Sequence, residues 1–366
     1  MIFPYRAVLL VLLVVLACGC VREGAPPSVI EASTTVAPST IDAAETTVKE
    51  ADDEPAIERG TADPDLILET YKPEKASPGT TLLPDNHNPD KPRVIEVNLL
   101  GEILWEYDLP ENLKEYTNPG FDVEPLTEGN ILIVLPRKGV YEINREGETV
   151  WSYLDSKVSH DADRLPNGNT LIVYGNNDQT TDSQVKEINR EGEIVWTWQA
   201  RDRFYDEYKD VNDQGWTHTN AAIRMENGNT LISPRNFNML VEVDPKGEVI
   251  RTIGGSYLKR QHDPEILDNG NILLANHDTP HEILELNPET DEIIWRYTIS
   301  DQKMWPVRDA NRLDNGNTLI TGATAILEVT PDKETVWKLK LKGGLFQAKQ
   351  AAERGFYKAE RIPPNP

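Results

Sequence analysis

A chain of 366 residues is long enough for two average domains, although all-β proteins often use more than 200 residues for one. Its 61 acidic residues outnumber its 37 basic ones, and the formal net charge is −24. Because such a charge repels nucleic acid and anionic lipid surfaces, and no basic patch interrupts it, we expect no nucleic-acid partner. Both cysteines lie before residue 21, so the rest of the chain has no disulfide, thiolate nucleophile, Cys-ligated zinc or iron–sulfur cluster.

Residues 1–20, "MIFPYRAVLLVLLVVLACGC", are predicted to be a signal peptide. The apolar run from Ala7 to Leu16 is too short for a comfortable transmembrane helix and fits an export signal. The strings that end at Cys18 and at Cys20 both resemble the lipobox of prokaryotic lipoproteins, in which the cysteine thiol is acylated. We expect an exported, lipid-anchored protein at the cell surface or on the periplasmic side of the membrane. The alternative is an ordinary signal peptide that contains cysteines.

Residues 21–75 are predicted to be a disordered linker. They are rich in Ala, Thr, Ser, Pro and acidic residues and contain almost no aromatic side chains. Such a composition buries too little apolar surface to offset the entropy of ordering. The segment would tether a globular body, residues 76–366, at a distance from the membrane.

One unit recurs after residue 76. Its turn appears as "LTEGNIL", "LPNGNTL", "MENGNTL", "LDNGNIL" and "LDNGNTL", with glycines at Gly129, Gly168, Gly228, Gly270 and Gly316. Asn-Gly between apolar runs favours a tight hairpin, because both residues tolerate positive φ. A second hairpin follows each time, as in "VYEINREGETVWSY". Units of four strands that repeat every 39 to 60 residues are typical of β-propeller blades.

The two ends of the chain supply a sixth blade. The segment "FYKAERIPP", which begins at Phe356, matches the opening strand of the other units, and Gly79 to Tyr107 matches the remaining three strands. Joining the termini in one sheet removes the exposed edges of an open ring. We therefore predict an all-β fold, a six-bladed β-propeller closed by its N- and C-terminal strands.

Tryptophans recur at one position of the outer strand in five blades and are absent from the blade that ends "EVIRTI". They are Trp105, Trp151, Trp196, Trp295 and Trp337. We interpret them as large side chains packed between neighbouring blades, with no role in chemistry.

Candidate site residues precede the hairpin turns. The opening strand of each blade lines the central channel, and His160, His218, His262 and Arg308 are predicted to share one register in four consecutive blades. A single histidine usually caps a strand, but three in register favour a functional site. Three imidazoles are also a known zinc ligand set. Arg308 and the nearby Arg235 disfavour a dication, so a bound anion suits the site better and we predict no metal.

The ordered strings "HDADRLPNGNTL", "HTNAAIRMENGNTLISPRN", "IRTIGG" and "QHDPEILDNGNILLANHD" resemble the prokaryotic arylsulfotransferases. The resemblance implies a six-bladed propeller that transfers a sulfuryl group from an aryl sulfate to a phenol, without a nucleotide donor or a cofactor. It makes His262 of "QHD" the nucleophile that becomes a sulfohistidine. His160, His218, Asn220 and Arg235 would surround the sulfuryl oxygens, and Arg308 would bind substrate.

Two questions stay open at this stage. The string "ANHDTPHE" adds His277 and His281 near the channel mouth, as loop residues or as part of an acceptor site. Because propellers host many unrelated functions, the alternative is a non-catalytic cell-surface propeller that binds a protein or glycan. A quinoprotein-like redox enzyme is a weaker alternative, because the channel residues are imidazole and guanidinium groups.

Overall fold

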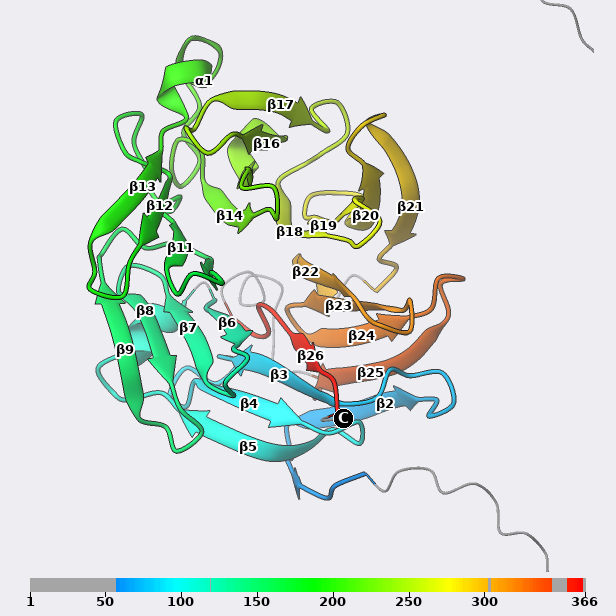
Figure 1. Cartoon of the computed structure of the whole chain (residues 1–366). Coiled ribbons are helices and arrows are strands. Elements are labelled where there is room, and N and C mark those ends of the chain that lie inside the picture. Colours follow the sequence, from blue (N-terminus) through cyan, green and yellow to red (C-terminus); the bar gives the residue numbers. More distant parts are fainter. Residues whose placement is uncertain (1–56, 119, 302–303, 344–353, 365–366) are drawn as a thin grey trace, which may run out of the picture. The chain divides into compact units, whose positions relative to one another are not determined.

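The computed structural model describes residues 57–118, 120–301, 304–343 and 354–364. Its strands form six antiparallel sheets arranged around a central axis, so the predicted six-bladed β-propeller is confirmed (Figure 1). Each blade runs from an inner strand at the axis to an outer strand at the rim. Cys18 and Cys20, with the whole predicted signal peptide, lie outside the described residues.

The first three blades along the chain contain four strands each. They are β6 (Asp122–Pro125), β7 (Ile131–Leu135), β8 (Gly139–Ile143) and β9 (Thr149–Leu154); β10 (Ala162–Arg164), β11 (Thr170–Val173), β12 (Val185–Ile188) and β13 (Ile194–Trp198); and β14 (Thr219–Arg224), β15 (Thr230–Pro234), β16 (Leu240–Val243) and β17 (Val249–Ile253). Among the described residues, the connections contain the short helices η1 (Lys114–Thr117), α1 (Arg201–Tyr208) and η2 (Arg235–Phe237).

The fourth blade also has four strands, whereas the fifth and sixth have five. The fourth is β18 (Gln261–Ile266), β19 (Ile272–Asn276), β20 (Glu282–Asn287) and β21 (Glu292–Thr298). The fifth is β22 (Val307–Arg312), β23 (Thr318–Gly322), β24 (Ala325–Val329), β25 (Thr335–Leu341) and the added β2 (Leu66–Tyr71). The sixth is β26 (Glu360–Ile362), β3 (Thr80–Asp85), β4 (Arg93–Val97), β5 (Glu102–Asp108) and the added β1 (Thr61–Ala62).

The ring is closed by the C-terminal strand, as predicted. Strand β26 pairs antiparallel with β3, with Glu360 opposite Leu82 and Ile362 opposite Thr80. A further bridge joins Phe356 to Asp85. The first and last strands of the ring therefore belong to one sheet, and its inner edge is paired.

The predicted linker over residues 21–75 extends too far toward the propeller. Residues 61–71 of that range form β1 and β2, which add outer strands to two blades. Leu66 is opposite Leu341 and belongs to a buried cluster with it. The prediction was wrong here because composition was averaged over a window that ends in a short alternating strand, "LILETY".

The recurring tryptophans join neighbouring blades. The Trp151 indole Nε1 donates to the Arg190 carbonyl of the next blade at 3.0 Å, and the Arg164 guanidinium lies 4.5 Å from the Trp151 ring centre. Equivalent indole-to-carbonyl bonds are made by Trp105, Trp196, Trp295 and Trp337. In the blade without tryptophan, Arg251 occupies this position and its Nη1 donates to the Pro288 carbonyl at 3.1 Å. The Arg251 guanidinium therefore makes the interblade hydrogen bond that an indole makes in the other blades.

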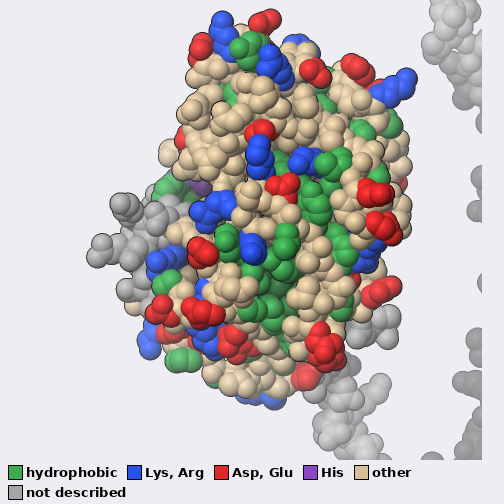
Figure 2. Space-filling view, turned by 90° about the vertical axis from the view of Figure 1, so that its left-hand side faces the viewer, with side chains coloured by type: hydrophobic (Ala, Val, Ile, Leu, Met, Phe, Trp, Pro, Cys, Tyr) green, Lys and Arg blue, Asp and Glu red, His purple; other side chains and the backbone are tan. Residues whose placement is uncertain are grey.

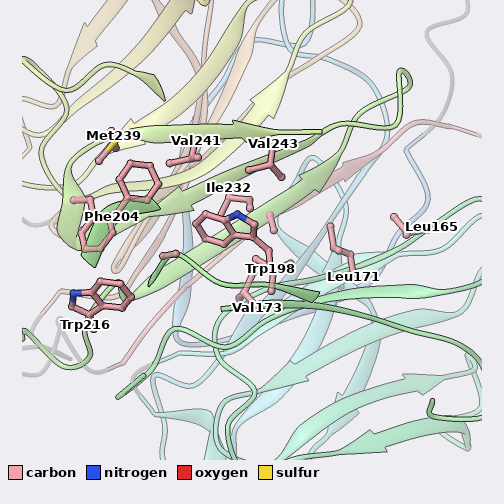
Figure 3. Packing of buried hydrophobic residues seen from close by; sticks show 14 residues of the cluster. Leu165, Leu171, Val173, Trp198, Phe204, Trp216, Ile232, Met239, Val241 and Val243 are labelled. Carbon is pink, nitrogen blue, oxygen red and sulfur yellow. The ribbon is translucent and has the colours of Figure 1, made fainter. Parts of the chain in front are cut away.

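Apolar side chains fill the space between adjacent blades. Figure 3 shows one such cluster, in which Trp198 of β13 lies between two sheets together with Ile232 and Val241 of the next blade. Phe204 of α1 and Trp216 extend this cluster through ring contacts with Phe237. The blades thus share a continuous packing that fixes the inner strands relative to one another.

Apolar side chains remain exposed on the rim. Figure 2 shows them among charged residues on the side where β9 and β13 form the outer strands. They include Val150, Leu154, Ile194 and Val195, each more than half exposed. None of the helices in the described part of the chain is long and apolar enough to cross a membrane.

Candidate functional site

The candidate site lies where the inner strands begin. Asn220 is in β14, His262 in β18 and Arg308 in β22, and each of these strands has a β-bulge at that residue or directly after it. A bulge interrupts the alternation of side chains and redirects them, and bulges are common beside functional sites. Three consecutive blades thus carry the same local distortion next to the channel.

The predicted register was wrong for His218. Arg164 is opposite Thr170 in one blade and Arg224 is opposite Thr230 in the next, which makes Asn220, not His218, the equivalent of His160. His218 precedes that position by two residues and lies just before β14. The imidazole of His218 nevertheless reaches the site from the loop before β14.

A buried carboxylate fixes the backbone at His218. Asp178 Oδ1 accepts hydrogen bonds from the backbone N–H groups of Thr217 and His218, at 3.2 and 3.1 Å. Asp178 Oδ2 accepts one from the Thr217 hydroxyl at 2.9 Å. His218 has a φ of 45°, an uncommon left-handed conformation for a histidine, so these bonds stabilise a strained backbone. Trp216 supports the same loop, since its Nε1 donates to the Tyr208 carbonyl at the end of α1.

His160 and His218 form a hydrogen-bonded pair. Their Nε2 atoms are 3.1 Å apart, and the two rings stack with centres 5.1 Å apart. His218 Nδ1 lies 3.0 Å from the Gln214 carbonyl, which can only accept, so His218 carries its proton on Nδ1. His218 Nε2 is then the acceptor and His160 Nε2 the donor. Burial is the main cause that lowers the pKa of His160 to about 3 and the pKa of His218 well below its usual value, so both rings are neutral near pH 7.

His262 lies beside a fourth histidine. Its ring stacks on that of His277, with centres 4.7 Å apart and planes inclined by 21°. Among the described residues, the buried Nε2 of His262 has no hydrogen-bond partner. Burial, followed by the charges of His277 and Arg235, lowers the pKa of His262 well below its usual range. The ring is therefore neutral and offers an unused nitrogen.

Two buried guanidinium groups provide the positive charge. Burial lowers the pKa of Arg235 and of Arg308 to about 10 each, and both remain charged near pH 7. Arg235 begins η2 and donates only to neutral oxygens, those of the Asp213 carbonyl and the Asn236 side chain, and it forms no ion pair with a described carboxylate. Both guanidinium charges lower the pKa values of His160 and His262. The structure thus brings the predicted residues together at one site.

Asn220 connects two neighbouring blades, those of β14 and β18. Its Nδ2 donates to the Gln261 carbonyl at 2.9 Å, directly before His262, and its buried Oδ1 has no hydrogen-bond partner in the described part of the chain. The amide therefore fixes the start of β18 relative to β14.

Sequence reasoning missed several members of the site. The ring of Tyr357 stacks on His160 at 5.9 Å and lies 5.0 Å from the Arg308 guanidinium. Arg308 also donates to the Phe356 carbonyl at 3.1 Å. Trp305, half-buried, contacts His277 with ring centres 6.1 Å apart. The segment directly before β26 and the loop before β22 supply these contacts, and the repeat motif marks the first but not the second.

A charged layer lies next to the site in the channel. Lys358 is buried, and its ammonium is 3.4 Å from Asp263 Oδ2 and 3.6 Å from Glu360 Oε1. A cavity of about 870 Å³ borders it, lined by Asp161, Asp163, Glu265 and other residues. Within the described ranges, no group of His, Cys, Asp or Glu side chains is arranged to bind a metal ion. An internal cation, the lysine, balances part of the acidic charge instead.

The fold and the site define a class of protein: a six-bladed propeller with neutral imidazoles and guanidinium groups at one mouth of its channel. The family model described as Arylsulfotransferase (ASST) matches residues 68–256, just over half of the chain, and the chain belongs to this family. The matched region contains His160, His218, Asn220 and Arg235, and it ends six residues before His262.

Solved structures share the propeller fold. A protein of unknown function from Bacteroides caccae is 20% identical with a TM-score of 0.56, over 77% of this chain and 98% of that one. A catalytically inactive virginiamycin B lyase from Staphylococcus aureus, solved with quinupristin, is 12% identical with a TM-score of 0.48, over 74% of this chain and 86% of that one. No curated protein sequence matches the chain.

Proposed function

We propose that this protein transfers a sulfuryl group from an aryl sulfate to a phenol through a covalent intermediate on His262. The observation that carries the proposal is an unused nitrogen on a neutral, buried imidazole beside two guanidinium groups, one of which, Arg235, has no described carboxylate partner. A buried cation without a counter-ion is costly, and a sulfuryl group would supply the missing negative charge. Membership of the arylsulfotransferase family supports this assignment.

The first half-reaction would use His262 as nucleophile. The imidazole nitrogen forms a bond to sulfur while the bond between sulfur and the aryl oxygen breaks, and the departing phenolate takes up a proton. Arg235 and Arg308 offset the charge on the sulfuryl oxygens. His160 lies close enough to contribute to the lowered pKa of His262. In the second half-reaction a phenol oxygen attacks sulfur, the sulfur–nitrogen bond breaks, and the phenolic proton leaves.

The direct test is incubation with 4-nitrophenyl sulfate in the absence of an acceptor. We expect the addition of one sulfuryl mass and a burst of one equivalent of 4-nitrophenol. Cleavage after arginine and lysine leaves His262, His277 and His281 on one peptide, Gln261–Arg296, so fragmentation within this peptide must assign the modified residue.

The variant His262→Asn should lose both the adduct and the turnover, since an amide cannot form the intermediate. The matched control is His87→Asn, which changes a histidine that is paired with Asp85 and absent from the site. Full turnover by His262→Asn, or an adduct on another residue, would overturn the assignment. Binding without any adduct in the wild-type protein would favour a non-catalytic propeller.

We place this activity outside the cytoplasm. The signal-like residues 1–20 and the lipobox-like cysteines Cys18 and Cys20 support export and acylation. Replacing both cysteines by serine would then release the protein from the membrane fraction without changing the propeller. Retention of the double variant in that fraction would argue against acylation.

A further inference from the structure

The loops of two neighbouring blades build an aromatic wall on one side of His262, formed by His277, His281 and Trp305. His277 follows β19 directly, and Trp305 lies two residues before β22. The ring centre of Trp305 is 6.1 Å from that of His277 and 5.9 Å from that of His281. His277 in turn stacks on His262 at 4.7 Å. Flat aromatic surface thus borders the group that would carry the sulfuryl.

The wall is held in place by its own hydrogen bonds. The Nδ1 of His281 lies 2.6 Å from the His277 carbonyl, which must accept, so His281 carries its proton on Nδ1. The His281 N–H donates to the Asp278 carbonyl at 2.9 Å, and the Asp278 N–H donates to the Lys259 carbonyl at 3.2 Å. The loop is therefore closed on itself and attached to the segment that leads into His262.

His277 has an unused proton-accepting position. Its Nδ1 is buried and has no hydrogen-bond partner among the described residues. Burial, then the charges of Arg308, Arg235 and Arg260 and of His281, lower its pKa to about 3. A bound anion between Arg235 and Arg308 would offset two of these charges. The proton affinity of His277 would then rise when substrate binds, because the repulsion that lowers it would decrease.

We propose that this wall is the subsite for the aromatic ring of the substrate, and that His277 exchanges the phenolic proton during transfer. The proposal rests on the sulfuryl transfer proposed above and assigns its leaving-group chemistry. When substrate binds, Nδ1 of His277 takes up a proton from solvent, and as the bond between sulfur and the donor oxygen breaks, His277 gives this proton to that oxygen and becomes neutral again. As the acceptor oxygen bonds to sulfur and the bond to His262 breaks, Nδ1 of His277 takes the acceptor's proton and releases it to solvent when the product leaves, which restores the neutral starting state.

Binding tests the subsite without any turnover. In the His262→Asn background, Trp305→Ala should raise the Kd of 4-nitrophenyl sulfate about tenfold, the factor that corresponds to one lost aromatic contact. The Kd of inorganic sulfate should not change, because that anion has no ring. Trp151→Ala, an equal change at a blade interface, should affect neither. Equal weakening of both ligands by Trp305→Ala, or weakening of neither, would overturn the subsite.

Leaving-group dependence tests the proton transfer. In the wild-type protein, rates with a series of substituted phenyl sulfates should depend weakly on the pKa of the released phenol. His277→Asn should lower the rate with phenyl sulfate about 10²-fold or more beyond its effect on 4-nitrophenyl sulfate, whose phenolate leaves unaided. If His277 had only a structural role, His277→Asn would lower all rates by the same factor and leave the dependence of rate on phenol pKa unchanged. The control His87→Asn should also leave that dependence unchanged.

The two proposals fail in different ways. Absence of a sulfohistidine in the wild-type protein would remove the proposed function and the proton-transfer role of His277, while the binding experiment would still decide the aromatic subsite. Presence of the sulfohistidine with an unchanged dependence of rate on phenol pKa in His277→Asn would remove only the role of His277.

Discussion

At the scale of single residues, the site depends on backbone positions that a histidine or aspartate seldom adopts. His218 has a φ of 45° and Asp263, next to His262, has a φ of 40°. Such conformations persist only where neighbouring groups fix them. For His218 those groups are the oxygens of Asp178, 40 residues earlier in the chain. The histidine pair is thus positioned by a loop of the preceding blade.

Asp178→Asn should weaken both folding and transfer. The amide has one oxygen in place of two. Its NH2 group would face backbone N–H groups of Thr217 and His218, which now donate hydrogen bonds to the carboxylate. Unpaired buried donors cost about 1–3 kcal/mol each, and we expect a loss of this size in the free energy of unfolding. Urea titration and the rate of 4-nitrophenol release measure the two effects. Asp206→Asn, on the exposed face of α1, is the control, and equal behaviour of the two variants would contradict this role.

At the scale of elements, hairpins and strands were predictable while distortions within them were not. The Asn-Gly turns identified the blades because positive φ is a local requirement, and Gly168 indeed has a φ of 86°. The bulges next to the site leave no local signal, but the register itself was readable: Asn220, like His160, lies eight residues before the turn glycine of its blade, whereas His218 lies ten residues before Gly228. Arg251 occupies the tryptophan position through contacts that only the neighbouring blade supplies. Residues whose role is set by another blade are the ones a single sequence hides.

The contacts between blades repeat and should be energetically important. Glu142 is buried and accepts from Arg164 at 2.8 Å and Arg190 at 2.6 Å, and Arg164 also covers Trp151. Removing one member of a buried ion pair leaves an uncompensated charge and costs about 3–5 kcal/mol. We expect a loss of this order for Glu142→Ala in urea unfolding. Glu146→Ala, in the exposed turn of the same blade, should change stability little, and a similarly small loss for Glu142→Ala would show that the blades do not depend on this pair.

At the scale of the whole molecule, the channel concentrates acidic groups around one lysine. Burial raises the pKa of Glu124 to about 8, those of Glu265 and Glu360 to about 7, and that of Asp122 to about 6. The acidic neighbours of Lys358 raise its pKa further above the usual value. The channel therefore retains protons on carboxyl groups at a pH where an unfolded chain has released them.

Stability should fall as pH rises from about 7 to 8. In that range the histidines of the unfolded chain are mostly neutral and its carboxyl groups, which titrate near pH 4, are ionised, while the folded protein still holds protons on Glu124 and its neighbours, so the free energy of unfolding decreases with pH. Thermal unfolding at several pH values measures the slope. Glu124→Gln should flatten it, because the amide does not titrate, whereas Glu128→Gln in the exposed hairpin should not. A slope of opposite sign, or one that Glu124→Gln leaves unchanged, would contradict a protonated channel.

The closure of the ring by β26 also sets an order in time. Tyr357 and Lys358 lie within the last ten residues of the chain, and the Phe356 carbonyl accepts from Arg308. A chain emerges from the ribosome, or crosses a membrane, with its N-terminus first. Every histidine of the site therefore emerges well before Tyr357 and Lys358. The site is therefore completed only after residues 356–358 have been made. Shorter chains carry the imidazoles without the groups that organise them.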